Sequence, residues 1–200
     1  MKGLLLKDLY VLMRQMKIFL VMIVIFALVP GGSMTVFAVV YAGMMPYTAL
    51  AYDERCKWDV LAGMMPYTKR QIVLSKYVLG YLFVLGTAVF SLLAKVVTQH
   101  FTSQSADVAS VLLALCAGFI MLAVTLPPMF RFGVEKGRLF FILLMVVVAC
   151  GSAGLVQGVM QTPDLQPYMP LLSAALPAAA LVLNLISVPL SVRLYRGGEN

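Results

Sequence analysis

Residues 18–52 read IFLVMIVIFALVPGGSMTVFAVVYAGMMPYTALAY and contain no charged side chain over 35 positions. As one helix this run would be about 52 Å long, whereas the hydrocarbon core of a bilayer is about 30 Å thick. The run must therefore bend, and the turn-forming stretch 30–33, PGGS, lies near its middle. We predict two membrane-spanning helices, 12–30 and 34–52, joined by a tight hairpin, with Arg14 and Lys17 reaching back to the membrane surface.

The rest of the chain has the same character. Of its 200 residues, 62% are hydrophobic and only 12% are charged, a composition typical of membrane proteins. Further spans are predicted at 77–98, 107–129, 139–161 and 170–192. The expected fold is therefore an all-α integral membrane protein whose residues 1–200 form one transmembrane domain of six helices.

The basic residues give the orientation, because positive charge gathers on the cytoplasmic side of membrane proteins. In the six-helix topology, 14 of the 15 Lys and Arg residues fall on the side that holds both termini. They are Lys2, Lys7, Arg14, Lys17, Arg55, Lys57, Lys69, Arg70, Lys76, Arg131, Lys136, Arg138, Arg193 and Arg196. We therefore expect both termini to be cytoplasmic. Lys95 remains near the outer end of the third span, either as a snorkelling anchor or as a pathway charge.

The first seventeen residues are predicted to form an amphipathic helix on the inner membrane surface. Its apolar face carries Leu5, Leu9, Leu12 and Met16, and its polar face carries Lys7, Tyr10, Arg14 and Lys17. The net charge of +7 belongs to this surface and to the basic loops. Anionic lipid is a sufficient partner for it, and nucleic acid is not indicated.

The connection 53–76 is the longest polar segment of the chain. Two opposite-charge pairs are spaced four residues apart in it, Asp53 with Lys57 and Arg55 with Asp59, which favours a short helix. Pro66 should end that helix, and Thr68 with Gln71 is a capping box that opens the next one. The segment is either an interfacial hairpin anchored by Trp58 or a docking element for another protein.

A second connection, RFGVEKGR at 131–138, follows Pro127 and Pro128, which are expected to kink or end the fourth span. Its charged residues Glu135, Lys136 and Arg138 either mark the membrane interface or contact a partner.

The heptapeptide AGMMPYT occurs twice, at 42–48 and at 62–68. The first copy falls in the second span and the other in the polar connection, so the two are not equivalent structural repeats. In the first copy, Pro46 is expected to kink the span and expose Met44 and Met45 as an adaptable apolar surface.

Catalytic and metal-binding patterns are missing from the sequence. There is no HExxH, GxSxG or intramembrane carboxylate pair, and the single histidine, His100, falls in an outer loop. The three cysteines have no paired spacing. No GxxxxGK[ST] loop is present, so any ATP must be bound by a separate chain. We predict no enzyme activity, no metal site and no cofactor on this chain.

The chain resembles the small six-helix permeases of the ABC-2 type, a group that includes the exporter of phenol-soluble modulins, which are amphipathic peptides. The resemblance rests on MKGLLLKDLY at 1–10, MPYTKRQIVLSKY at 65–77 and LPPMFRFGVEKGR at 126–138. It implies a permease in the bacterial plasma membrane that exports amphipathic peptides or other amphiphilic cargo. It also implies two permease subunits, identical or related, and a separate ABC ATPase that binds ATP and Mg²⁺.

The resemblance also implies roles for individual residues. The connection between the second and third spans would contain a coupling helix that docks on the ATPase through Asp53, Glu54, Lys57, Trp58 and Asp59. A pathway between the two permeases would be lined by the second and fifth spans, which nominates Met44, Met45 and Gln157. The alternatives are a membrane-embedded binding or immunity protein that does not transport, and an unrecognised membrane enzyme or ion-coupled carrier.

Overall fold

The computed structural model describes residues 2–15, 17–28, 32–101, 108–161 and 169–195. These residues form eight helices and no strand. In chain order they are α1 (Lys2–Gln15), α2 (Lys17–Leu28), α3 (Gly32–Gly43), α4 (Met45–Arg55), α5 (Trp58–Gly63), α6 (Lys69–Phe101), α7 (Val108–Gln161) and α8 (Met169–Leu194). The prediction of an all-α chain is confirmed over this part of the protein.

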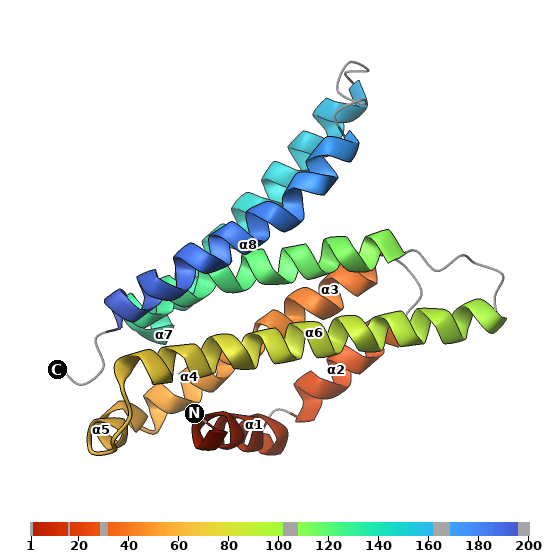
Figure 1. The fold of residues 1–200 in the computed structure, drawn as a ribbon. Coiled ribbons are helices and arrows are strands. Elements are labelled where there is room, and N and C mark those ends of the chain that lie inside the picture. The colour runs from red at the N-terminus through yellow and green to blue at the C-terminus, as the bar shows by residue number, and fades with distance from the viewer. Residues whose placement is uncertain (1, 16, 29–31, 102–107, 162–168, 196–200) are drawn as a thin grey trace.

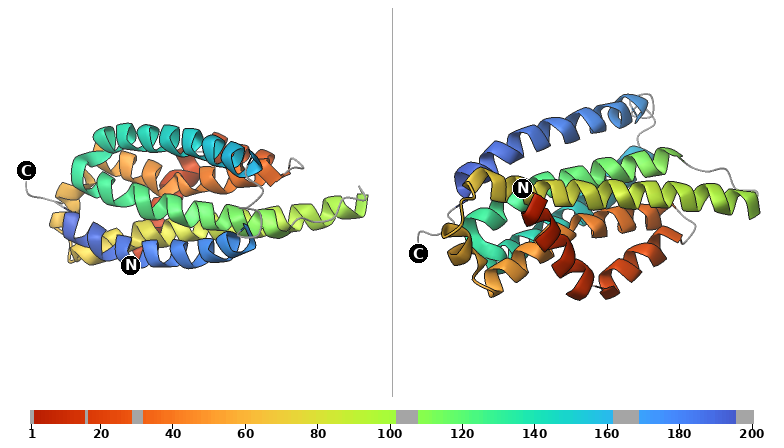
Figure 2. Two further views of the ribbon diagram at one scale, coloured as in Figure 1. Left: turned by 90° about the horizontal axis from the view of Figure 1, so that it is seen from above. Right: turned by 60° about the horizontal axis from the view of Figure 1, so that its bottom comes forward.

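Helix α6 and the first part of α7 lie side by side and pack on α3 (Figure 1). The second part of α7 and helix α8 are both inclined to them, and the view from above in Figure 2 shows these two on opposite sides of the bundle. The start of α1, the end of α8 and helix α5 lie at the same end of the bundle, here called the α5 end. Helices α1 and α2 form a V beside that end (Figure 2).

Four helical segments of the described chain are long and apolar enough to cross a membrane. They are Thr35–Arg55, Lys69–Val97, Ser110–Val134 and Ala175–Leu194. The first span was predicted to begin at residue 12, but α1 extends to Gln15. Helix α2 therefore begins at Lys17 and has 12 residues. The second part of α7 continues to Gln161, but its side chains beyond 143 lie outside the described residues. A multi-pass membrane protein is supported, and the number six stays a prediction.

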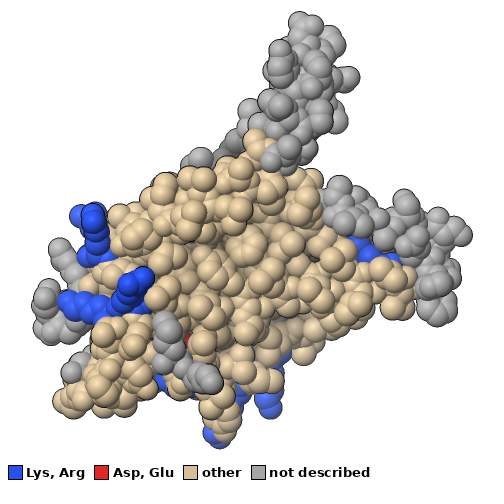
Figure 3. Space-filling model, viewed as in Figure 1, with Lys and Arg blue, Asp and Glu red and all other residues tan. Residues whose placement is uncertain are grey.

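On the face seen in Figure 3, charged side chains lie around the edge of the molecule. Figure 3 shows Lys and Arg gathered around the α5 end and below α1, with one further basic patch toward the far end of α6. The surface over the middle of the helices carries no charge on this face. This distribution fits helices whose central part lies in hydrocarbon.

Helices α3 and α4 follow each other with one turn residue between them. Met44 adopts a right-handed helical conformation, and Pro46 occupies the first turn of α4, where its missing N–H is not needed. The break is therefore slight, and the two helices together provide one span. The prediction that this kink exposes both methionines is wrong for Met45, which is 0% exposed and packs against Leu12 and Leu79.

Helix α7 breaks at Gly133, so the expectation that the helix ends at Pro127 and Pro128 is wrong, while the alternative of a kink there stays a prediction. Pro127 and Pro128 lie inside a continuous helical stretch, whereas Gly133 has φ 80° and ψ 171°. That conformation is essentially restricted to glycine, so the helix must stop there and restart at Val134. The turn is tight, since a Cβ on Gly137 would lie 2.7 Å from Met129 Cγ.

The core depends on close approach of α6 to its neighbours. Valines and leucines from α3, α6 and α7 form the largest buried cluster, which includes Val39, Val84 and Leu122. A Cβ added to Gly80 would lie 2.7 Å from Leu122 Cδ2 and 3.2 Å from Pro46 Cγ, so this glycine sets the spacing of α6 against α7 and α4.

Glycine 80 provides a test of this packing. We expect Gly80→Val to destabilise the protein by about 1–3 kcal/mol, because the added methyl groups overpack the contact with Leu122. Gly86→Val on the same helix is the matched control, since a Cβ there meets nothing within 4 Å. Thermal unfolding in detergent measures both, and equal melting temperatures for the two variants would contradict the proposed close contact.

Candidate functional site

The α5 end is built from a short helix and a corner. Lys57 adopts a left-handed conformation with φ 48° and separates α4 from α5. Helix α5 ends at Gly63 before Pro66, and α6 then begins with reciprocal bonds of 3.3 Å between Thr68 and Gln71. The predicted capping box is confirmed. The short helix starts at Trp58, whereas the charge spacing predicted that it would start near Asp53.

Four charged side chains from three helices meet at the base of this element. Lys76 Nζ of α6 lies 2.7 Å from Asp8 Oδ2 of α1 and 2.5 Å from Asp53 Oδ2 of α4. Lys7 Nζ lies 2.6 Å from Asp53 Oδ1 and 3.1 Å from Asp8 Oδ1. The side chains of Lys76 and Asp8 are only 2% exposed. The cluster, called here the four-charge cluster, is electrically balanced, which is what allows these charges to be buried.

The cluster extends into the polar connection through Trp58. The Lys7 ammonium lies 4.0 Å from the centroid of the Trp58 ring, a cation–π contact. Asp53 therefore pairs with Lys7 and Lys76, and the predicted intrahelical pairing of Asp53 with Lys57 is wrong because Lys57 has left the helix.

The outer surface of α5 is apolar. Val60 and Leu61 are more than 45% exposed, and Met64, directly after the helix, is 80% exposed. Apolar side chains concentrated on a short helix indicate a surface that contacts either another protein or the membrane.

The neighbouring carboxylate contacts a different helix. Glu54 Oε2 accepts a hydrogen bond of 2.7 Å from the backbone N–H of Val134, the first residue after the break in α7. Asp53 and Glu54 thus connect the end of α4 to α1, α6 and α7.

A ladder of polar side chains joins α6 to α8 within their apolar stretches. Tyr77 Oη lies 2.5 Å from Ser187 Oγ and 2.8 Å from Ser191 Oγ, and all three residues are buried. One helical turn further along α6, Tyr81 donates to Asn184 Oδ1 over 2.9 Å. The Asn184 amide donates to the carbonyls of Phe119 and Ala180.

One rung of this ladder explains why α7 continues through its prolines. Pro127 has no N–H, so the carbonyl of Ala123, four residues earlier, loses its helical donor. Ser187 Oγ donates to that carbonyl over 2.6 Å. Because a serine hydroxyl has one hydrogen, Tyr77 must then donate to Ser187 and Ser191 to Tyr77. The chain of hydrogen-bonded hydroxyls therefore ends on the Ala123 carbonyl, which Pro127 leaves without a helical donor.

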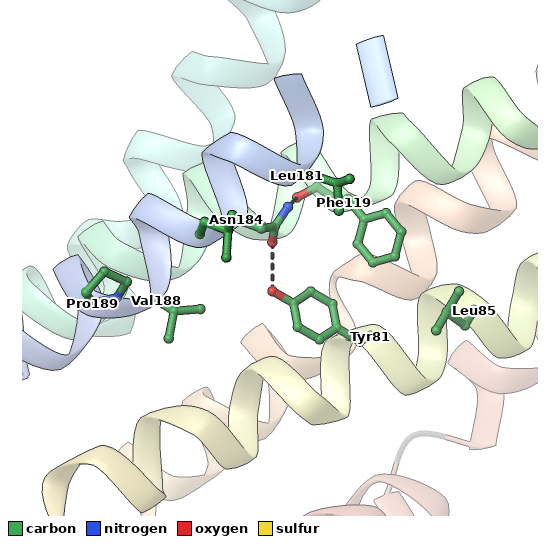
Figure 4. A pocket seen from close by; sticks show the side chains of 8 residues that line it. Tyr81, Leu85, Phe119, Leu181, Asn184, Val188 and Pro189 are labelled. Carbon is green, nitrogen blue, oxygen red and sulfur yellow. Dashed lines mark hydrogen bonds between the residues drawn. The ribbon is translucent and has the colours of Figure 1, made fainter. Parts of the chain in front are cut away.

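A pocket of about 480 Å³ opens between α6 and α8 where the ladder ends (Figure 4). The hydrogen-bonded pair of Tyr81 and Asn184 forms part of its wall, and Phe119 of α7 lies beside them. The other lining residues are apolar: Leu85, Leu181, Leu185, Val188 and Pro189. Both amide hydrogens of Asn184 and the hydroxyl hydrogen of Tyr81 are already donated, so the pocket has no spare donor for an anionic group.

Comparison with protein families decides the identity. The family described as "ABC-2 family transporter protein" matches residues 3–196, which is nearly the whole chain. The chain belongs to the ABC-2 transporter family. No curated protein and no solved structure gave a match.

Membership in the ABC-2 family makes the chain the membrane subunit of an ABC transporter, so the chain is not expected to be an enzyme itself. It also implies a partner ABC ATPase and a membrane location. Among the described residues of this ABC-2 protein, no group of three or more His, Cys, Asp or Glu side chains could hold a metal ion.

The structure places the nominated docking residues in different roles. Asp53 is half-buried in the four-charge cluster, and Glu54 is exposed with its carboxylate on the Val134 N–H. Trp58 is half-buried and Lys57 is exposed. The side chain of Asp59 lies outside the described residues, as do those of Glu135, Arg138 and Gln157. Lys136 is exposed and Met44 is half-buried.

Sequence reasoning missed the four-charge cluster and the ladder, although both leave a signal. Asp8 is the one acid in the basic helix 1–17, and it lies beside the apolar face that Leu5 and Leu12 define. Tyr77 and Tyr81 are four apart, as are Ser187 and Ser191, so each pair shares one face of an apolar helix.

The four-charge cluster predicts that removing one charge lowers stability more than removing two opposite charges together. Lys76→Met should destabilise this ABC-2 protein by about 3–5 kcal/mol, because the buried Asp8 and the half-buried Asp53 are then left with Lys7 as their one shared counter-charge. Adding Asp8→Asn to Lys76→Met should recover part of that loss, which unfolding in detergent would show. Arg70→Met, an exposed basic residue of the same helix, is the control. A double variant less stable than Lys76→Met would contradict the pairing.

The ladder predicts a coupling between Ser187 and Pro127. Ser187→Ala should cost about 1–3 kcal/mol by leaving the Ala123 carbonyl unpaired. In a Pro127→Ala background the restored N–H of residue 127 can satisfy that carbonyl, so the same change should cost less. A double-mutant cycle measured by thermal unfolding tests this, and additive effects would show that the two residues do not share the carbonyl.

Proposed function

We propose that this chain is the permease subunit of an ABC exporter, and that a separate ATPase docks on α5 and hydrolyses ATP. The observation that carries this proposal is the apolar surface of α5, held away from the bundle on a base fixed by buried charges. A free loop would absorb the movement of a partner, whereas a rigid base passes it to the helices. The α5 end corresponds to the cytoplasmic side in this proposal.

The docking surface combines the residues nominated from the sequence with the exposed apolar ones. The nominated residues and the exposed apolar ones belong to one stretch of the α5 end. They are Lys57, Trp58 and Asp59, followed by Val60, Leu61 and Met64. Glu135, Lys136 and Arg138, directly after the break in α7, form a second contact with the ATPase. Asp53 supports this surface from within, and Glu54 joins its base to α7.

The cargo in this proposal is an amphipathic peptide or another amphiphile. The α6–α8 pocket is lined by hydrocarbon and has no free donor, which suits an apolar group and disfavours an unpaired anion. A pathway between two copies, or two related permeases, would be lined by Met44, Met45 and Gln157. Met45 reaches such a pathway only in a second conformation, since it is buried in this one.

The mechanism is a shift between two conformations of the helix bundle. Closure of the ATPase subunits on ATP moves α5, and the four-charge cluster carries this movement to α1 and α6. Cargo is moved only if it binds the two conformations with different affinities. The alternative is a membrane protein that binds a partner without transport, and it predicts binding without ATP turnover.

The first experiment measures binding and ATP hydrolysis by the candidate ATPase with the purified chain. Leu61→Ser together with Met64→Ser should weaken the complex by about 2 kcal/mol, or roughly thirtyfold in Kd, because two exposed apolar anchors are lost. These residues are preferable to Trp58, whose change would also remove the contact with Lys7.

Cys56→Ser is the control, because this exposed residue lies in the same connection but outside the apolar surface. Unchanged affinity of the Leu61/Met64 variant would remove α5 as the docking helix. A wild-type chain that binds no ABC ATPase would favour the non-transporting alternative.

A further inference from the structure

The break in α7 leaves a helix start without a side-chain cap of its own. Gly133 directly precedes the second part of α7, where Ser, Thr, Asp or Asn would normally accept a hydrogen bond from the first N–H groups. A glycine has no side chain to do this. Its φ of 80° and ψ of 171° exclude a capping residue in its place.

The missing cap comes from the end of α4. Glu54 Oε2 accepts the Val134 N–H over 2.7 Å, although the two residues are 80 positions apart in the chain. The other oxygen, Oε1, would lie 3.1 Å from a Cβ on Gly133, so the carboxylate covers the break. A negative charge at the start of a helix is also favoured by the helix dipole.

We infer that Glu54 is a positioning residue that couples the docking helix α5 to the second part of α7, and this inference rests on the proposed function. Glu54 lies on the last turn of α4, and α5 begins four residues later. Its neighbour Asp53 is held by Lys7 and Lys76, so the end of α4 cannot rotate freely. A displacement of α5 therefore reaches Val134 through a single charged hydrogen bond.

The fold indicates which part of the bundle this hydrogen bond affects. The ladder holds α8 to α6 and to the first part of α7, through Tyr77, Tyr81 and Asn184. The second part of α7 begins after the break at Gly133, so a change of the angle there moves this segment relative to α6 (Figure 1). Glu54 thereby connects the state of the docking helix to the position of the second part of α7.

The test compares three variants of Glu54 by a distance between spin labels. Cysteine-free protein receives labels at Leu93→Cys on α6 and Leu143→Cys on the second part of α7, both exposed positions. The wild-type residue and Glu54→Gln, which keeps an acceptor oxygen, should give one narrow distance distribution. Glu54→Ala should broaden it. Glu54→Asp, which keeps the charge but is one methylene shorter, should do the same.

The second arm uses the complex with the ATPase. ATP with vanadate should change the label distance in wild-type protein and in Glu54→Gln. In Glu54→Ala the ATPase should still bind and hydrolyse ATP. The fraction of labelled molecules whose distance changes on adding nucleotide should fall about tenfold, as expected for loss of a hydrogen bond to a charged group. Arg55→Ala, an exposed charge on the same helix end, should behave as wild type.

The outcomes separate this inference from the proposed function. A Glu54→Ala protein with the wild-type distance distribution, or with the full response to nucleotide, would overturn the coupling role. If no ATPase binds the wild-type chain, the proposed function fails, and the label distances without nucleotide still decide whether Glu54 sets the angle of α7. A merely structural role would lower the melting temperature and leave the nucleotide response of the folded fraction intact.

Discussion

The burial of Lys76 between the carboxylates of Asp8 and Asp53 is the interaction on which the α5 end depends. An ammonium group that is 2% exposed is tolerated only when opposite charge surrounds it, and here the charges come from three separate helices. The amphipathic helix α1, the end of α4 and the start of α6 are consequently held in one arrangement. The projecting helix α5 is mounted on that arrangement, and Trp58 packs under Lys7 of the same cluster.

Deeper in the bundle, buried polar groups also need partners within the protein, and here the partners are hydroxyls and an amide. In hydrocarbon every polar backbone group needs a partner within the protein. Pro127 leaves the Ala123 carbonyl without its helical donor, and Ser187 supplies one from α8. The resulting ladder holds α8 against α6 and α7 up to Asn184, and the α6–α8 pocket opens there. The proline is thus the reason that a serine on another helix is needed, and the ladder determines where the pocket lies.

These two polar networks fit a transport subunit of the ABC-2 family. The four-charge cluster makes the α5 end rigid, and the ladder holds α8 against α6 and α7. Between them, Gly133 lets the second part of α7 change direction, with its first N–H bound to Glu54. A protein that must change conformation when a partner moves needs both rigid contacts and a defined place to bend. The bend of α7 lies next to the end of α4, from which α5 follows.

The sequence by itself determined what depends on local composition and spacing. The apolar run 18–52 had to contain a turn, the segment 1–17 had to be amphipathic, and Thr68 with Gln71 capped α6 as the pattern requires. The family also followed from three short stretches of sequence. Only the tertiary structure decided that Asp53 pairs with Lys7 and Lys76, that Met45 is buried, and that α7 breaks at Gly133 and passes through Pro127. Each of these depends on a side chain from a helix distant in sequence, because a buried charge or an unpaired carbonyl is stabilised by whichever partner the fold brings within hydrogen-bonding distance.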